Sequence, residues 1–294
     1  MNEVLLAHES QIRLGFFAGI LGVMALWEAL APRRLRGQSR WLRWTNNLGL
    51  VVLNTGVVRL AIPVLAAQMA LRAESAGWGL LHQWDLPRGL AVLLAVVALD
   101  LVIYLQHVMF HAVPALWRLH RMHHADTDID VTTGSRFHPL EILLSMGLKL
   151  AVVSALGAPP EAVVAFEILL NGTAMFNHAN ARLPLGLDRI LRWVVVTPDM
   201  HRVHHSARPE EANSNFGFNL PWWDLLLGTY RAQPREGHLG MTIGLNALRD
   251  SREQWLHRLV LQPWSGAGRG YDLTRSAEPD GTSRSGSPAR EASR

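Results

Sequence analysis

The chain of 294 residues contains no cysteine. This absence excludes disulfides, iron–sulfur clusters, thiolate-ligated haem and zinc ribbons. Charged side chains are also sparse, at 18% of the residues, and the basic ones are almost all arginine, with Lys149 the only lysine. The formal net charge is +4. We expect no nucleic-acid partner, because the arginines follow the topology of a membrane protein better than a single binding stripe.

Long apolar stretches are present instead, at residues 14–31, 48–71, 89–105, 142–157 and 162–176. A spanning helix needs ~20 mostly apolar residues, so the first three stretches predict membrane spans. The last two are short and predict a hairpin over 142–176 that turns in the Gly-Ala-Pro-Pro sequence at 157–160. The alternative is a large soluble helical protein with buried helices. A signal peptide at 14–31 is disfavoured, because Glu28 interrupts its end.

The orientation follows from five arginines between residues 33 and 43, since short Arg-rich loops stay in the cytoplasm. The third span then returns to the cytoplasm just before residue 107, and the hairpin returns to the same side at residue 178. We therefore predict an all-α fold, with an integral-membrane helical anchor under a cytoplasmic histidine-rich cap, in a bacterial inner membrane. One membrane-embedded domain would cover 1–262, with the cap at 107–140 and 178–262. A polar tail at 263–294 is expected to be disordered.

The sequence His-Arg-x-His-His occurs twice, at 120–124 and 201–205. On a helix, positions i, i+3 and i+4 share a face, so each copy can direct its imidazoles toward one point. A further i, i+4 pair lies at 107 and 111, and two more histidines lie between the motifs. Ten nitrogen ligands are too many for one tetrahedral zinc and suit two metals of higher coordination number. These candidate ligands are His107, His111, His120, His123, His124, His138, His178, His201, His204 and His205.

Nearby polar side chains are candidates for orienting the ligands, because a ligating histidine usually donates its other N–H to a carboxylate or carbonyl. These are Asp100 and Tyr104, in one stripe with His107 and His111, together with Asp126, Asp128, Asp130 and Asp199. Thr197-Pro198 predicts a helix start before the second motif. Pro139 predicts another, with Glu141 meeting Arg136 or the free N–H groups of the first turn. Lys149 and Glu167 are expected to pair across the hairpin, unless Lys149 reaches the interface and Glu167 faces a substrate cavity.

Together these motifs resemble the fatty acid hydroxylase and sterol desaturase superfamily of integral-membrane di-iron oxygenases. The resemblance runs from about residue 100 to 230. It rests on His-x-x-x-His at the end of a span, Leu-Trp-x-x-His-x-x-His-His, Arg-x-His-Pro-x-Glu, an Asn-His after a hairpin, a second His-x-x-His-His, and Trp-Asp-x-Leu-x-Gly-Thr. It implies two iron ions held by nine of the histidines above, with His138 as a tenth. It also implies O2-dependent hydroxylation or desaturation of a lipid C–H bond in a sterol or fatty-acyl type of substrate.

Electrons would come from a separate reductase, ferredoxin or cytochrome, because the chain has no cysteine for an iron–sulfur centre. Other classes of function remain open. A membrane zinc hydrolase is disfavoured, because residues 107–111 lack the glutamate of His-Glu-x-x-His, although zinc in a purified sample would suit the same imidazoles. A metal transporter would place its ligands near the bilayer midplane. A non-catalytic metal- or lipid-binding membrane protein is the other alternative.

Overall fold

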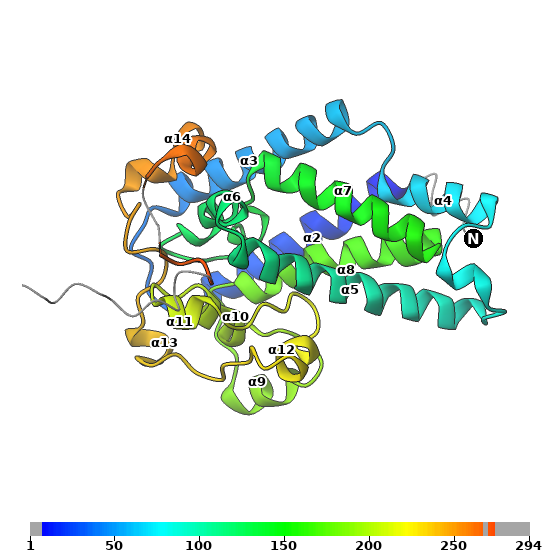
Figure 1. The fold of residues 1–294 in the computed structure, drawn as a ribbon. Helices are drawn as coiled ribbons and strands as arrows, with labels where there is room; N and C mark the ends of the chain where they lie inside the picture. Colours follow the sequence, from blue (N-terminus) through cyan, green and yellow to red (C-terminus); the bar gives the residue numbers. More distant parts are fainter. Residues whose placement is uncertain (1–7, 267–269, 274–294) are drawn as a thin grey trace, which may run out of the picture.

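The computed structural model describes residues 8–266 and 270–273. Over these residues the chain forms helices and loops without a named strand. Long helices lie side by side as a bundle, and short helices gather at one end of it as a cap (Figure 1). The bundle consists of α2 (Glu9–Leu30), α3 (Arg40–Ala61), α4 (Ala66–Ala76), η1 (Leu80–Gln83), α5 (Arg88–Ala112), α7 (Pro139–Leu156) and α8 (Pro160–His178).

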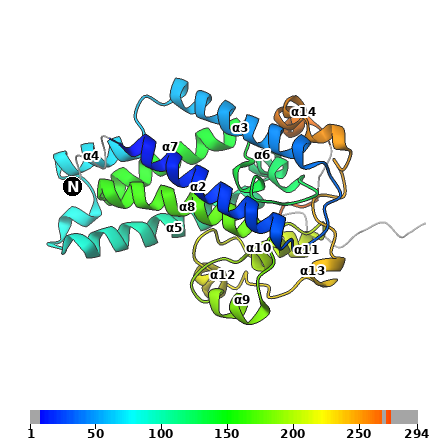
Figure 2. The same cartoon turned by 180° about the vertical axis from the view of Figure 1, so that it is seen from behind.

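The cap is built from shorter elements that follow the bundle helices along the chain. They are α6 (Pro114–His124), η2 (Thr133–Ser135), α9 (Leu185–Leu191), α10 (Pro198–His204), α11 (Pro209–Ala212), α12 (Trp222–Leu226), α13 (Gly237–Gly240), η3 (Ser251–Gln254), α14 (Leu256–Leu261) and η4 (Gln262–Trp264). Seen from behind, α2 crosses the bundle and ends at the cap (Figure 2). The predicted all-α architecture is confirmed.

Four helical stretches are long and apolar enough to cross a membrane: Glu9–Leu30, Arg40–Gln83, Arg88–Ala112 and Pro139–Leu156. Each contains most of one predicted span or the first arm of the predicted hairpin. Large apolar side chains such as Leu14, Val52 and Leu93 are exposed on these helices. Exposed apolar side chains on long helices are suited to lipid rather than water. The chain is therefore a membrane protein.

The hairpin prediction is confirmed by the path of α7 and α8. Gly157 ends α7 in the left-handed conformation, with φ of 63°, and α8 begins at Pro160. A Cβ at Gly157 would lie 2.2 Å from the carbonyl oxygen of Trp78. Glycine therefore also permits the close approach of the loop between α4 and η1, which contains Trp78. Lys149 Nζ lies 2.7 Å from Glu167 Oε1, as expected for a pair across the hairpin.

The short helix of the second histidine motif begins as the sequence predicts. The Thr197 hydroxyl accepts a hydrogen bond from Met200 N–H, and Pro198 occupies the first turn of α10. These features stabilise a helix of only seven residues, which would be marginal alone. The first motif lies in the last turns of α6, so both copies are helical.

Buried polar side chains fix the cap to the bundle. Glu28, on α2, accepts hydrogen bonds from Val131 N–H and Asn180 N–H at 2.7 and 2.8 Å. The fully buried Arg43, on α3, pairs with Asp126 at 2.7 Å and with Asp130 at 2.5 Å. Removing one partner of such a buried pair costs about 3–5 kcal/mol. These contacts hold α2 and α3 against the loops that carry the histidines.

The prediction of a disordered tail at 263–294 is wrong for residues 263–266 and 270–273, which the structure describes. Residues 263–266 continue from α14 through η4, and Tyr271 stacks on Trp117 with ring centroids 6.1 Å apart. Tyr271 donates a hydrogen bond to Ala207 O at 2.7 Å. One aromatic side chain with a buried partner is enough to order this piece of an otherwise polar segment. Residues 267–269 and 274–294 lie outside the described residues.

Candidate metal centre

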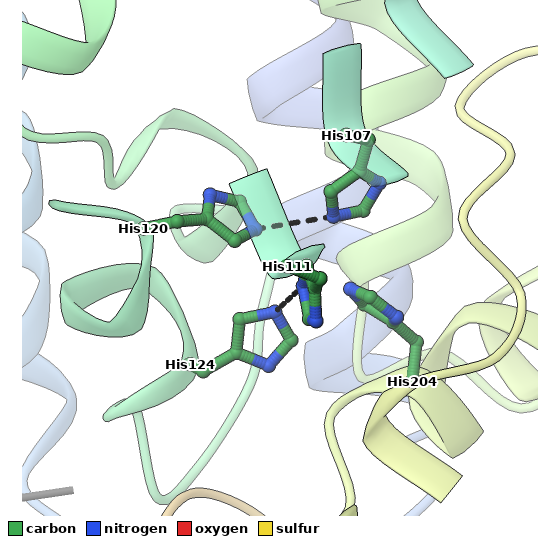
Figure 3. Close-up of side chains that lie close together, drawn as sticks. All are labelled: His107, His111, His120, His124 and His204. Carbon is green, nitrogen blue, oxygen red and sulfur yellow. Dashed lines mark hydrogen bonds between the residues drawn. The ribbon is translucent and has the colours of Figure 1, made fainter. Parts of the chain in front are cut away.

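Nine of the ten candidate histidines form two buried clusters. In each cluster the possible ligand atoms lie within 4.8 Å of one another. The first cluster contains His107, His111, His120, His124 and His204, and the second contains His123, His178, His201 and His205. In Figure 3 the five rings of the first cluster converge on a common space from three helices.

Each histidine motif contributes to both clusters. In the first motif, on α6, His120 and His124 belong to the first cluster, while His123 belongs to the second. In the second motif, His204 faces the first cluster, while its neighbour His205 faces the second. The two clusters therefore share their supporting helices and lie next to each other.

The imidazole nitrogens lie at distances suited to shared metal ions. Four pairs of Nε2 atoms are each 3.1 Å apart: His107–His120, His111–His124, His123–His178 and His178–His201. Two imidazole nitrogens that bind one metal at ~2.1 Å and at a right angle to each other lie ~3.0 Å apart. Because neutral imidazoles carry one N–H each, a dense set of inward-facing Nε2 atoms is unsuited to a simple hydrogen-bond network.

Backbone carbonyls and polar side chains orient many of these rings from behind. The Nδ1 atoms of five histidines lie 2.7–3.0 Å from an oxygen, which fixes Nδ1 as the N–H and leaves Nε2 with a free lone pair. The pairs are His107 with Phe216 O, His111 with Asn213 Oδ1, His120 with Glu141 Oε1, His178 with Ala174 O and His204 with Ser214 O. A neutral histidine in this tautomer is the form that binds a metal.

Burial keeps five of the clustered histidines neutral. It is the largest cause that holds the pKa of His123, His124, His201, His204 and His205 well below the usual histidine range, and neighbouring imidazoles lower these values further. These groups are thus uncharged at neutral pH. Metal binding would not have to compete with their protonation there.

Several ring nitrogens have no hydrogen-bond partner among the described residues. These buried atoms are Nε2 of His204, Nδ1 of His201 and both ring nitrogens of His205. An unpaired buried polar atom costs about 1–3 kcal/mol, so four of them in one small region require a compensating ligand. Imidazole-rich sets without thiolate suit zinc, copper, iron and nickel. The residues present fit two transition-metal ions.

One face of α5 holds the loop 213–230 against the clusters. Asp100 accepts hydrogen bonds from Asn219 Nδ2 and Trp223 Nε1 at 2.7 and 2.8 Å, and the Tyr104 hydroxyl lies 2.8 Å from Thr229 Oγ1. Further along the same stripe, the two histidines of α5 contact this loop through their Nδ1 atoms. Asp100 and Tyr104 therefore position the loop that orients the ligands, and do not themselves contact a clustered ring.

Asp224 explains the Trp-Asp-x-Leu-x-Gly-Thr motif. Its carboxylate accepts hydrogen bonds from Phe216 N–H and Gly217 N–H, each at 2.8 Å, and from the Thr229 hydroxyl at 2.6 Å. Burial is the largest influence on the carboxyl and raises the pKa of Asp224. This one side chain fixes the turn whose Phe216 carbonyl orients His107.

Replacing Asp224 by asparagine is expected to weaken metal binding without removing a ligand. The NH2 of asparagine would face the N–H of Gly217 or that of Phe216, depending on the orientation of the amide, and this clash of two donors costs about 1–3 kcal/mol and loosens the loop behind His107. Thermal unfolding and metal content of the purified variant would measure both effects. Glu210→Gln, at a carboxylate whose side chain is 52% exposed, is the matched control and should leave both unchanged. Wild-type metal content and stability in Asp224→Asn would contradict the assigned role.

Three other predicted site residues lie elsewhere. His138 is the N-cap of α7, where Nδ1 accepts a hydrogen bond from Leu140 N–H at 3.1 Å and Nε2 lies 3.1 Å from Val260 O.

The predicted aspartates also lie away from the rings. Asp128 accepts hydrogen bonds from the backbone N–H groups of Gly37 and Gln38. Asp199 pairs with Arg33 and Arg202, and these cations hold the pKa of Asp199 to about 2 despite its burial. The structure therefore leaves His138 outside both clusters, and neither aspartate contacts a clustered ring. Asp126 and Asp130 pair with Arg43 instead.

Sequence reasoning missed two side chains that hold ligands in place. Glu141 accepts from His120 Nδ1 at 2.7 Å rather than meeting Arg136, whose Nε donates to Met122 O. Asn213 is not among the residues singled out from the sequence, and its Oδ1 is 3.0 Å from His111 Nδ1. The Arg-x-His-Pro-x-Glu motif was a signal for Glu141, but nothing in the spacing pointed to Asn213.

A cavity of about 500 Å³ leads from the clusters into the bundle. At one end it is lined by His107, His120 and Phe218, and towards the other by Lys149 and Glu167. Most of its wall is apolar and comes from the spanning helices, including Leu14, Phe17, Ile103, Val58, Met146 and Leu170. The fold and site thus define a helical membrane protein with two polyhistidine clusters that could hold metal ions at the end of an apolar cavity.

Residues 92–229 match the family model described as fatty acid hydroxylase. The chain is 31% identical over 229 residues to the ornithine lipid hydroxylase OlsE of Rhizobium tropici, in an alignment that covers 74% of this chain and 67% of that protein. The chain belongs to the fatty acid hydroxylase and sterol desaturase superfamily.

More distant relatives carry other printed functions. The chain is 30% identical over 165 residues to the alkylglycerol monooxygenase of Homo sapiens, in an alignment that covers 55% of this chain and 36% of that protein. It is 26% identical over 166 residues to the cholesterol 25-hydroxylase of Rattus norvegicus, in an alignment that covers 55% of this chain and 53% of that protein. The chain thus spans about a third to two thirds of these relatives. No solved structure matches.

Proposed function

We propose that the protein oxidises a C–H bond of a membrane lipid with O2 at a di-iron centre, by hydroxylation or desaturation. The observation that carries this proposal is that the apolar cavity ends at His107 and His120, which belong to the first histidine cluster. Relatives named as hydroxylases and a monooxygenase of lipids support oxidation of a lipid in general.

The nine clustered histidines would hold the two ions, and His138 is not part of the proposed ligand set. Bound iron would supply the O2 chemistry that no side chain can provide. The chain's own residues bind and orient. Phe216 O, Asn213, Glu141, Ala174 O and Ser214 O fix the imidazoles, while the apolar wall of the cavity aligns an alkyl chain and excludes water.

The test is metal analysis of the purified protein, followed by an assay for oxidised lipids. Purified full-length protein should contain two iron ions per chain. With a chemical reductant or a bacterial ferredoxin system and O2, lipid extracts should show products that gain one oxygen atom or lose two hydrogen atoms. One zinc per chain and no O2-dependent product would instead favour a membrane zinc hydrolase. A separate electron donor is part of the proposal, because the chain has no cysteine-ligated redox centre.

We propose that the cap faces the cytoplasm of a bacterial inner membrane. Three arginines in the loop between α2 and α3, with Arg40 and Arg43 in the first turn of α3, lie at the cap end of the bundle (Figure 2). Reporter fusions after Arg208 should therefore report the cytoplasm, and a fusion near Gln83 the opposite side. Alkaline phosphatase fusions report a location outside the cytoplasm and green fluorescent protein fusions report the cytoplasm, so the two reporters check each other. An external signal at Arg208 would contradict this orientation.

A further inference from the structure

Gln106 Oε1, on the residue before His107, is a buried acceptor without a donor on a residue that lines the cavity. Two others are Asn54 Oδ1 and Glu141 Oε2. The residues are 8% and 3% exposed, so bulk water does not reach them freely. Asn54 belongs to α3 and Glu141 to the first turn of α7.

The remaining contacts of these side chains fix which atom is left over. Asn54 Nδ2 donates to Phe137 O at 2.9 Å, which determines the orientation of the amide and leaves Oδ1 unpaired. Glu141 uses Oε1 for His120 Nδ1, which leaves Oε2. Phe137 lies between them in the chain and stacks on His123 with ring centroids 4.7 Å apart. Both free acceptors therefore belong to the histidine end of the cavity.

Unpaired acceptors are costly in an apolar cavity. Each costs about 1–3 kcal/mol when buried, and a carboxylate oxygen costs more than an amide oxygen. A saturated alkyl chain offers no donor to either atom. A carboxylate or phosphate head group offers mainly further acceptor oxygens and so does not satisfy these atoms. Only a group that donates hydrogen bonds satisfies such acceptors: a hydroxyl donates to one of the two, and an ammonium can donate to both.

The opposite end of the cavity has a different character. Lys149 lies eight residues after Glu141 on α7, or ~12 Å along the helix axis. There Glu167 is paired with Lys149 and with Arg13, each at 2.7 Å, so its charge is already balanced. Between the two ends the wall is apolar, with Met146 and Leu170. An alkyl chain fits this middle part, with its polar end at the histidines.

We propose that Asn54 and Glu141 select a lipid that carries a hydroxyl or ammonium group next to the oxidised carbon, and hold that group by hydrogen bonds at the metal end of the cavity. This inference rests on the proposed function and names the class of substrate for it. The alkyl chain of the lipid extends from there towards Lys149.

The experiment compares the binding of three matched probes to the iron-loaded full chain in lipid nanodiscs. The probes are 1-hexadecanol and hexadecylamine, which donate hydrogen bonds, and methyl hexadecyl ether, which does not. Native mass spectrometry without O2 measures their affinities without turnover. At least one of the two donor probes should bind about tenfold more tightly than the ether. Equal affinities for all three would overturn the inference.

Two variants locate the preference. Glu141→Gln keeps an acceptor for His120 but places an NH2 group at Oε2, and Asn54→Leu removes the amide. Each should reduce the preference about tenfold towards equal binding, and the iron content of each variant is measured beside it, because Glu141 also orients His120. Thr45→Val, on the same helix as Asn54, removes a hydroxyl that bonds its own helix and should keep the preference. An unchanged preference in both Glu141→Gln and Asn54→Leu would refute the assigned residues.

The two proposals can fail separately. A protein that shows the probe preference but neither iron nor O2-dependent product would refute the proposed function alone. A protein that oxidises lipid but binds the three probes equally would refute this inference alone.

Discussion

Replacing His204 or His123 by alanine is expected to remove iron and to abolish lipid oxidation. His204 belongs to the first cluster and His123 to the second, and both are fully buried. Each change removes an imidazole that faces several others within 4.8 Å, rather than a side chain that packs in the apolar core. We expect at least a hundredfold loss of turnover, of the order found when groups that support a metal are removed. Elemental analysis and product mass spectrometry measure the two effects.

His138→Asn is the matched control for these variants. His138 lies in the same cap but outside both clusters, and its role is to cap α7. Asparagine is a good N-cap residue, so this variant should keep its iron, its turnover and most of its stability. Full iron and turnover in either His204→Ala or His123→Ala, or loss of iron in His138→Asn, would contradict the ligand set.

Replacing Glu167 by leucine is expected to destabilise the protein more than replacing Lys149 by leucine. Glu167 is 2% exposed and its carboxylate contacts both Lys149 and Arg13. Its removal takes the carboxylate from Lys149 and leaves Arg13 with Glu9 alone, whereas removal of Lys149 leaves Glu167 paired with Arg13. We expect a loss of about 3–5 kcal/mol for Glu167→Leu and clearly less for Lys149→Leu. Thermal unfolding in detergent would rank them.

The charge-swapped double variant Lys149→Glu, Glu167→Lys tests the coupling. It should recover only part of the loss, because a cation at position 167 would face Arg13. Glu161→Leu is the control in the same helix: its side chain and that of Arg88 are 23% and 46% exposed, and such a surface pair contributes about 0–1 kcal/mol. Strictly additive losses in the double-variant cycle would exclude a direct interaction between Lys149 and Glu167.

The histidine motifs predicted that most of these imidazoles would lie together, because their spacing is a local property of a helix. The same holds for the starts of α7 and α10, which Pro139 and the Thr197-Pro198 pair mark. Topology was also accessible, since apolar length and the Gly157 turn predicted the spans and the hairpin. For Lys149 and Glu167 both readings proved partly right, because the two residues pair and also line the cavity.

What the sequence did not reveal depends on contacts between distant segments. Nothing in the spacing says that His123 and His124 belong to different clusters, because this depends on how α6 lies against α8 and α10. The partners of the imidazoles are largely backbone carbonyls, such as Phe216 O and Ser214 O, and these leave no trace in residue type. His138 was included because it is a histidine near the motifs. Its capping role appears only from the path of the backbone.

The interleaving of the two motifs has a consequence for how the centre is assembled. In the proposed di-iron centre, α6 and α10 would each supply imidazoles to both ions, so neither ion could bind without ordering the helices that the other needs. The energetic penalty of bringing α6 and α10 together is met once, by the first ion. The second ion then meets a prearranged pocket. Loading is therefore expected to be cooperative, with empty and doubly loaded chains outnumbering singly loaded ones when iron is scarce.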